Sequence, residues 1–303
     1  MKERKTVNYV LLSEGTGQGI EEKSNVSRLA GALVNDDFQR VHLEHGCGTD
    51  HRLMGRLIGS DAIEILLRHY KWLSQQGVGH RHDAAIYIFG FSRGALIARV
   101  LADLVCNVGV PCDAYDARRI FKYYRAKSGY DEALAAFRRE NRLTHPAKVK
   151  YLGIWDTVDS TVGICGEDYR KLPANVEYAR HAISRDEERR FFRPLMCEGA
   201  EELVFPGTHS DVGGTYPDNH VLADLSLAWV ANKAVDLGLR LKQGVEFSED
   251  VDLSNAVIHD SREESTNAWG RLDPVKRVLD GIRHHVACLK VSAGAFSISE
   301  RQP

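Results

Sequence analysis

Apolar and polar positions along the chain alternate between two patterns. Short runs that are apolar at most positions have the length of strands, and they predict strands at 7–12, 40–43, 84–90, 148–155 and 201–205. Longer segments between these runs predict helices at 25–34, 60–76, 93–107 and 221–237. Strands separated by helices imply the α/β class, with a mostly parallel central sheet covered by helices on both faces.

Local signals sharpen several of these elements. Residues 84–90 are apolar without interruption, as a strand buried on both faces should be. Ser60 is the expected N-cap of the 60–76 helix, which glycines at 77 and 79 should end. We expect the 221–237 helix to be amphipathic and the 201–205 strand to be the last of the sheet.

The composition is that of an ordinary globular protein and excludes several functions. A chain of 303 residues without repeats or a linker predicts a single domain over 1–303. Lysine and arginine number 40 against 42 acidic residues, a net charge of −2, whereas a dedicated nucleic-acid binder needs a basic excess. No apolar run suits a signal peptide or a membrane span, so we expect synthesis as a cytoplasmic protein.

The cysteine pattern argues against disulfides and metal. The chain has six cysteines: Cys47, Cys106, Cys112, Cys165, Cys197 and Cys288. None forms a C-x-x-C pair, so we expect reduced thiols, no structural zinc and no cofactor.

A G-x-S-x-G motif spans residues 90–94 as Gly-Phe-Ser-Arg-Gly, between a predicted strand and a predicted helix. This is the setting of a nucleophile elbow, a sharp turn whose flanking glycines leave room for neighbouring strands. The turn would present the Ser92 hydroxyl at the carboxyl edge of the sheet, near a helix N-terminus that favours a developing oxyanion. Ser92 is therefore the candidate nucleophile.

A serine nucleophile needs a base, and the base needs an orienting carboxylate. Asp156 ends a predicted strand and follows the serine in the chain order Ser, Asp, His, with Asp159 as its competitor. Among the later histidines, His209 is best placed, because it lies in a glycine-bearing loop after a short strand. His181 falls on a charged stretch predicted to be helical.

Six stretches together resemble one α/β-hydrolase domain family, long catalogued as a domain of unknown function, that includes the type VI secretion phospholipase effectors. The stretches are Glu14-Gly15-Thr16 with Asn25-Val26, Gly46-Cys47-Gly48-Thr49, Phe89-Gly90-Phe91-Ser92-Arg93-Gly94-Ala95, Trp155-Asp156-Thr157-Val158, His181-Ala182 with Arg189, Arg190 and Phe192-Arg193-Pro194, and Pro206-Gly207-Thr208-His209-Ser210-Asp211-Val212-Gly213-Gly214. They run from about residue 8 to about residue 235, and the last 65 or so residues match nothing.

The resemblance implies an α/β-hydrolase fold and a serine esterase, in several members a phospholipase A, with a Ser92-Asp156-His209 triad. The implied oxyanion donors are backbone N–H groups of Arg93 and of Gly15 or Thr16.

Three acidic residues take supporting roles in this picture. The family has Asp where this chain has Glu14, so the side chain whose carboxylate would hold the oxyanion loop is one methylene longer. Asp211 would bond the loop that carries His209. Asp211 or Asp159 also remains open as the triad acid.

The segment between the elbow helix and the Asp156 strand carries its own signal. Residues 118–142 hold eight basic and three acidic residues, a local excess of five positive charges, with aromatic residues interleaved. A helical insertion at 111–147 over the carboxyl edge would form a lid suited to an anionic phospholipid surface. A solvated helical pair packed by its aromatics explains the pattern equally well. Residues 238–303 form a C-terminal extension without an assigned role.

The expected function is therefore hydrolysis of an acyl ester or phospholipid through an acyl-enzyme. Two alternatives stay open: a catalytically inactive hydrolase fold that serves as a binding module, and a metal-dependent hydrolase using His209, Asp211 and Asp156. The resemblance adds peripheral membrane contact, an immunity or secretion partner, and export without a signal peptide.

Overall fold

The structure is a computed structural model. It describes residues 6–15, 24–46, 58–81, 83–111, 117–119, 147–158, 170–190, 192–262, 286–292 and 295–299, with the backbone alone for 58–60, 286–292 and 295–299.

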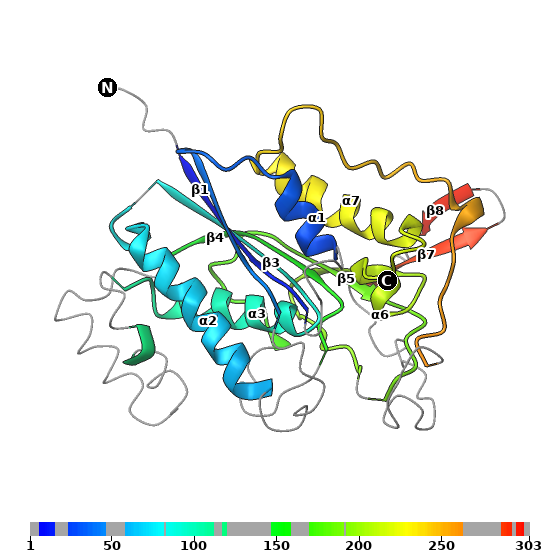
Figure 1. The fold of residues 1–303 in the computed structure, drawn as a ribbon, viewed down its shortest axis with the longest axis horizontal. Helices are drawn as coiled ribbons and strands as arrows, with labels where there is room; N and C mark the ends of the chain where they lie inside the picture. The colour runs from blue at the N-terminus through cyan, green and yellow to red at the C-terminus, as the bar shows by residue number, and fades with distance from the viewer. Residues whose placement is uncertain are drawn as a thin grey trace.

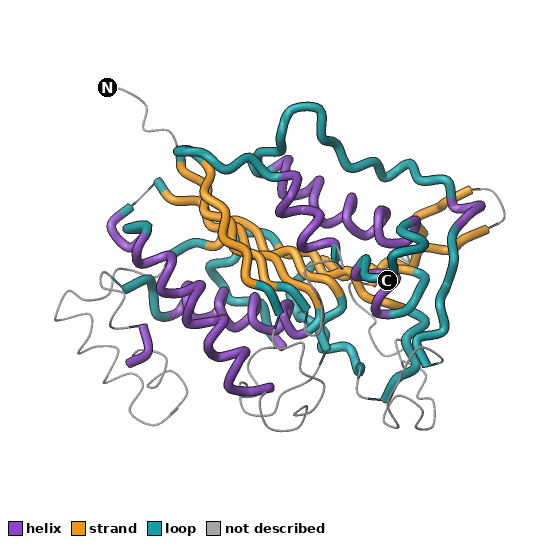
Figure 2. Tube along the Cα trace, in the orientation of Figure 1, coloured by secondary structure: helices purple, strands orange, loops and turns teal. Residues whose placement is uncertain are grey.

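An eight-stranded sheet forms the centre of the molecule (Figure 2). From one edge to the other the strands are β2 (Gln39–Glu44), β1 (Val7–Ser13), β3 (Ala84–Phe91), β4 (Val149–Trp155), β5 (Ala179–Ser184), β6 (Glu201–Phe205), β7 (Val286–Ser292) and β8 (Ala295–Ser299). Every neighbouring pair is parallel except β7 and β8, which are antiparallel. The mostly parallel sheet predicted from the sequence is thus confirmed.

Helices cover both faces of the sheet (Figure 1). On one face lie α2 (Ile58–Gln75) and α3 (Arg93–Asn107), whose apolar side chains share a core with the strands. On the other face lie α1 (Asn25–Ala32) and α7 (Val221–Asp236), which share a second core. The short helix α6 (His209–Gly213) follows β6, and two single-turn 3-10 helices occupy Val78–His80 (η1) and Leu253–Asn255 (η4).

Three strands differ from the sequence prediction. The stretch around His181 is strand β5 and not a helix, because pairing with β4 and β6 on both sides outweighs its charged local composition. The sheet also continues beyond β6, since β7 pairs with β6 and β8 pairs with β7. Part of the extension at 238–303 therefore belongs to the central sheet.

Two helices also differ in detail. Helix α2 begins at Ile58, so Ser60 lies inside its first turn and not at its N-cap. Helix α7 is buried almost all round instead of being amphipathic. The reason is that apolar residues of the C-terminal segment, such as Phe247 and Val251, pack on the core that α7 shares with the sheet.

Some expectations concern residues at the margin of the described structure. Of the 111–147 insertion, only positions 111, 117–119 and 147 are described, so its role as a lid stays a prediction. Arg118 forms an ion pair of 2.8 Å with Glu64 on α2. Cys106 and Cys197 are buried free thiols, as expected. None of the helices within the described ranges has the length and apolar character needed to cross a membrane.

Close packing in the middle of the sheet makes Gly153 of β4 sensitive to substitution. A Cβ atom there would lie 2.7 Å from the Phe89 ring and 2.7 Å from Val230 Cγ1 of α7. We expect Gly153→Ala to lower the free energy of unfolding by about 1–3 kcal/mol, the usual cost of overpacking. Gly31→Ala is the matched control, because a Cβ at this α1 position meets nothing within 4 Å. It should stabilise by about 1 kcal/mol through helix propensity. Urea denaturation measures both, and equal stabilities would contradict the packing argument.

Candidate active site

Ser92 stands at the turn between β3 and α3, as the G-x-S-x-G motif predicts. Its backbone has φ 58° and ψ −122°, a region that residues with a side chain rarely adopt. Its N–H donates a 3.0 Å hydrogen bond to the Trp155 carbonyl of β4. Its own carbonyl accepts from the N–H groups of Ala95 and Leu96. The strained turn is thus fixed both by the neighbouring strand and by the helix that follows.

The two glycines of the motif are required by close approach of backbone segments. A Cβ atom on Gly90 would lie 2.3 Å from the Gly94 carbonyl oxygen. A Cβ on Gly94 would lie 2.2 Å from the Ser13 carbonyl oxygen at the end of β1. Neither contact can be relieved by moving a side chain, since both partners are backbone atoms. The motif is therefore the steric condition for the turn.

Asp156 occupies the equivalent place on the next strand, directly after β4. Within the described residues, it and Ser92 alone among non-glycine residues have a positive φ, here 38°. Its side chain is fully buried and accepts three hydrogen bonds. Oδ1 accepts from the Ser184 N–H (2.9 Å), while Oδ2 accepts from the Ser184 hydroxyl (2.9 Å) and from His209 (2.6 Å). Three donors compensate this carboxylate for its loss of water.

His209 opens helix α6 and points its Nδ1 atom at Asp156. A carboxylate only accepts, so Nδ1 carries the proton and Nε2 is left with its lone pair. Burial lowers the pKa of His209 below its ordinary value of 6.5, and the hydrogen bond and charge of Asp156 partly offset that fall. The imidazole is therefore neutral near pH 7, as a general base must be.

Aromatic packing brings His209 toward the serine turn. The imidazole lies 4.6 Å from the Phe91 ring, measured between centroids, and Phe91 directly precedes Ser92. On another side it contacts Phe192 edge-on at 4.9 Å. The Arg189 guanidinium in turn covers the Phe192 ring at 3.6 Å. The His209 ring is thus in contact with two phenylalanines, one of which is the neighbour of Ser92 in the chain.

The turn after β1 also reaches Ser92. A Cβ atom built on Gly15 would meet the Phe91 ring at 2.9 Å and Ser92 Cβ at 3.4 Å, so the Gly15 backbone lies directly against the serine. Thr16, the other expected oxyanion donor of this turn, is outside the described residues. Arg93, the remaining expected donor, is the first residue of α3.

Glu14 ties the two ends of the same loop together. It follows β1, and its buried carboxylate accepts from the hydroxyls of Ser24 (2.5 Å) and Ser27 at the start of α1. Burial raises the pKa of Glu14, while both hydroxyls and the Gly15 N–H lower it. The glutamate side chain therefore links β1 to α1 across the loop.

Asp211 holds the loop that carries His209. Its carboxylate accepts from the N–H (2.8 Å) and the hydroxyl (2.9 Å) of Thr208, the N-cap of α6, and from the ring of His259 (2.5 Å). The Nδ1 proton of His209 faces Asp156 and not Asp211. Asp159, the other competitor, lies outside the described residues. In the part of the chain that is described, no three His, Cys, Asp or Glu side chains group into a metal-binding set.

Several site residues were not predicted from the sequence. Ser184 is the last residue of β5, which the sequence did not predict as a strand, so its contact with Asp156 could not be predicted either. Glu187 accepts from the backbone N–H of His209 (3.2 Å) and lies in a charged run that gave no positional signal. His181 is buried below the site, where Nε2 accepts from the Thr157 N–H (3.1 Å) and Nδ1 bonds Glu202 (2.8 Å).

The family match covers most of this architecture. Residues 7–233, three quarters of the chain, match the family described as T6SS, Phospholipase effector Tle1-like, catalytic domain. An uncharacterized protein of Saccharomyces cerevisiae is 35% identical over 126 residues, which cover 36% of this chain and 18% of the yeast protein.

Several solved structures are similar to this chain at low identity. The Tle1 effector bound to the VgrG spike of the Type 6 secretion system has 18% identity and a TM-score of 0.43, covering 70% of this chain and 52% of that one. An uncharacterized protein from Pseudomonas aeruginosa has 16% identity and a TM-score of 0.46, covering 78% and 46%. A thermophilic esterase from Thermogutta terrifontis has 11% identity and a TM-score of 0.40, covering 80% and 85%.

The chain spans about half the length of the first two solved proteins and about a fifth of the yeast protein. The matched residues hold β1 to β6, the serine turn, and the loops of Asp156 and His209. The chain therefore belongs to the family of the Tle1-like phospholipase effector catalytic domain.

Proposed function

We propose that this protein hydrolyses acyl esters of phospholipids through a covalent acyl-enzyme on Ser92. The observation that supports the proposal most directly is the bond between His209, whose pKa burial lowers, and a buried aspartate that follows the strand next to the strained serine turn. Strained non-glycine backbone is kept where function requires it, at a cost of about 1–3 kcal/mol for each residue. Two such residues end adjacent strands here.

In the proposed reaction, His209 Nε2 takes the proton of the Ser92 hydroxyl as the oxygen attacks the ester carbonyl. Asp156 keeps the Nδ1 proton in place and stabilises the imidazolium that forms. The imidazolium then protonates the leaving alcohol, which leaves an acyl-enzyme. Water activated by the same imidazole releases the fatty acid and restores Ser92.

The negative charge on the carbonyl oxygen needs two donors. We assign one to the backbone N–H of Arg93, which opens α3 beside Ser92, and the other to the turn at Gly15 or Thr16. The contact of the Gly15 backbone with Ser92 supports this assignment. The Glu14 bonds to Ser24 and Ser27 would hold that turn still while charge develops.

The proposal also includes the lipid substrate, the route of export and the extent of the catalytic domain. Membership in a phospholipase effector family supports a phospholipid substrate, contact with a membrane surface, export without a signal peptide, and a secretion or immunity partner. The pairing of β7 with β6 supports one catalytic domain over 1–303. The basic insertion at 111–147 would then act as the lid over the lipid.

Covalent labelling tests the nucleophile. A fluorophosphonate probe should label the wild-type protein at Ser92, because an activated serine attacks phosphorus as it attacks a carbonyl. Ser92→Ala should lose both labelling and hydrolysis. Ser210→Ala, a neighbour of the histidine, is the control and should keep labelling. A folded wild-type protein that stays unlabelled would instead favour an inactive binding module.

The pH dependence tests the base. Because the His209 pKa lies below 6.5, kcat/KM should rise with pH through the acidic range and already be level near pH 7. Asp156→Asn removes the group that raises this pKa and fixes the tautomer, so kcat should fall roughly 10³- to 10⁴-fold. Asp252→Asn, which removes a surface carboxylate that caps η4, is the control and should keep the wild-type profile. A profile still rising above pH 7.5 would contradict the assignment.

A substrate panel tests the lipid assignment separately. Wild type should release fatty acid from phosphatidylglycerol or phosphatidylethanolamine vesicles, and Ser92→Ala should not. Short p-nitrophenyl esters serve as the comparison. Hydrolysis of the short esters alone would keep the serine mechanism and remove the phospholipid substrate.

A further inference from the structure

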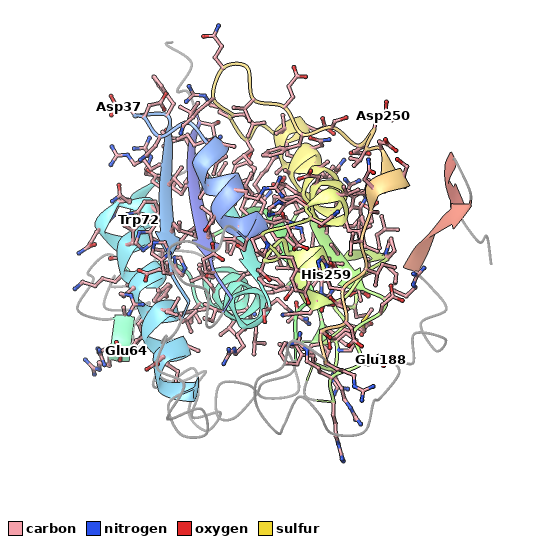
Figure 3. The ribbon with its side chains drawn as sticks, turned by 45° about the vertical axis from the view of Figure 1, so that its right-hand side comes forward. Asp37, Glu64, Trp72, Glu188, Asp250 and His259 are labelled. Carbon is pink, nitrogen blue, oxygen red and sulfur yellow. The ribbon has the colours of Figure 1, made fainter. Side chains whose placement is uncertain are left out.

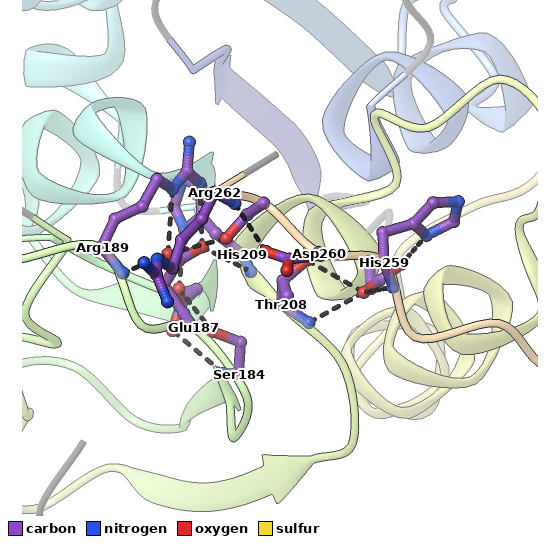
Figure 4. A network of polar contacts seen from close by, with 11 residues as sticks. Ser184, Glu187, Arg189, Thr208, His209, His259, Asp260 and Arg262 are labelled. Atoms are coloured by element: carbon purple, nitrogen blue, oxygen red, sulfur yellow. Dashed lines mark hydrogen bonds and ion pairs between the residues drawn. The ribbon is translucent and has the colours of Figure 1, made fainter. Parts of the chain in front are cut away.

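A segment outside the family match returns to the site from the C-terminal side. Residues 256–262 follow η4 and contact both loops that hold His209, the one after β6 and the one after β5 (Figure 4). Figure 3 places His259 beside α6 and Glu188 in the loop after β5. We call residues 256–262 the strap.

The first contact of the strap is made by His259. Its Nδ1 bonds Asp211 Oδ1 at 2.5 Å, and its backbone N–H donates to Asp211 Oδ2 at 3.2 Å. Its Nε2 faces Asp218 Oδ2 at 3.2 Å, and its ring stacks on Tyr216 with 3.8 Å between centroids. Four contacts therefore hold His259, two of them to Asp211, although Asp211 itself takes part in no proposed chemical step.

Asp211 transmits that contact to the histidine. It forms a capping box with Thr208, in which the aspartate side chain binds the Thr208 N–H and hydroxyl. Thr208 directly precedes His209, so its cap fixes the backbone from which the imidazole projects. Helix α6 has five residues and cannot fix its own first turn by length alone.

The second contact is made by Ser261. Its hydroxyl donates to Glu187 Oε1 at 3.0 Å, and the other oxygen of Glu187 accepts the His209 backbone N–H at 3.2 Å. Arg189 binds the same carboxylate through two nitrogens at 2.8 and 2.9 Å. Arg262 adds an ion pair of 3.7 Å with Glu188. The strap therefore binds both Glu187, which accepts from the His209 backbone, and Asp211, which caps the preceding Thr208.

We propose that His259, supported by Ser261, is a positioning residue that sets the orientation of His209 for proton transfer. This inference rests on the proposed role of His209 as the base. The strap binds Asp211 and Glu187, so we expect it to act on His209 through these two carboxylates. A misplacement of the imidazole by about 1 Å can cost on the order of a hundredfold in rate.

The charge of His259 gives this contact a pH dependence. Burial lowers the pKa of His259, but hydrogen bonds and charge from Asp211 and Asp218 outweigh it and raise the pKa above 6.5. Asp260, its neighbour in the strap, accepts instead from the backbone N–H of Arg262 at 2.9 Å. Both ring nitrogens can donate only while the ring is protonated. The full contact is present below pH 6.5 and weakens as pH rises through the raised pKa.

Kinetics of the full chain with His259→Ala provide the main test. We expect kcat to fall roughly ten- to a hundredfold with KM little changed, because the substrate site stays intact while the base is misaligned. His259→Gln keeps one donor toward Asp211 without titrating, so it should recover most of kcat and lose any alkaline decline that wild type shows. Asp252→Asn, in the same C-terminal segment but without contact to either loop, is the matched control.

Two readouts do not depend on activity. Hydrogen exchange at residues 207–214 should speed up in His259→Ala. Ser261→Ala should show the same increase, and it replaces His259→Ala as the test if that variant fails to fold. The low-field proton signal of His209 Nδ1 should broaden or shift in the same variants. Unchanged kcat, exchange and proton signal in both variants would overturn the positioning role. If the probe does not label Ser92 in the wild type, the proposed function is overturned. Hydrogen exchange at 207–214 would still decide the role of the strap.

Discussion

The hydrogen bond from the Ser92 N–H to the Trp155 carbonyl is the contact on which the rest of the site depends. Ser92 follows the last residue of β3, and the residue after Trp155 is Asp156, so one bond fixes the proposed nucleophile and the proposed acid relative to each other. The strand register, with Phe91 opposite Trp155, gives the same alignment. The strained turn at Ser92 can persist because the sheet on both sides determines it, through this bond and through the glycines that admit the end of β1. Two members of the proposed triad thus need no further support than the sheet itself.

His209 is in a different position, because it follows β6 and lies two strands away from β4. The sheet cannot bring its ring to Ser92 directly, so side chains must do so. Asp156 binds the ring, Glu187 binds the backbone, and Asp211 fixes the preceding cap. These anchors come from loops, which tolerate change more readily than strands. The strap returns from the C-terminal side and binds two of these carboxylates, Asp211 and Glu187. It therefore adds rigidity to the loops that hold His209.

The sequence predicted the parts that local chemistry dictates. Strands β1 to β4, helix α3 and the serine turn follow from apolar runs and from glycines that only one backbone geometry explains. Strand β5 was missed because its stability comes from neighbours on both sides, which the chain order does not reveal. For the same reason Ser184 could not be linked to Asp156. His259 could not be linked to Asp211 either, since 48 residues separate them and no spacing rule connects a loop with a distant strap.

Burial of the site explains why its carboxylates need so many hydrogen-bond donors. Burial raises the pKa of Glu14 and lowers that of His209, each toward its neutral form. The proposed mechanism needs His209 neutral at rest and charged in the transition state, so the same burial that prepares the base opposes its protonation. In that mechanism the Asp156 carboxylate offsets the conflict by stabilising the imidazolium, and the donors of Ser184 and His209 compensate the buried carboxylate for its loss of water. In the proposed mechanism the hydroxyl of Ser184 would support base catalysis through the Asp156 carboxylate, to which it donates.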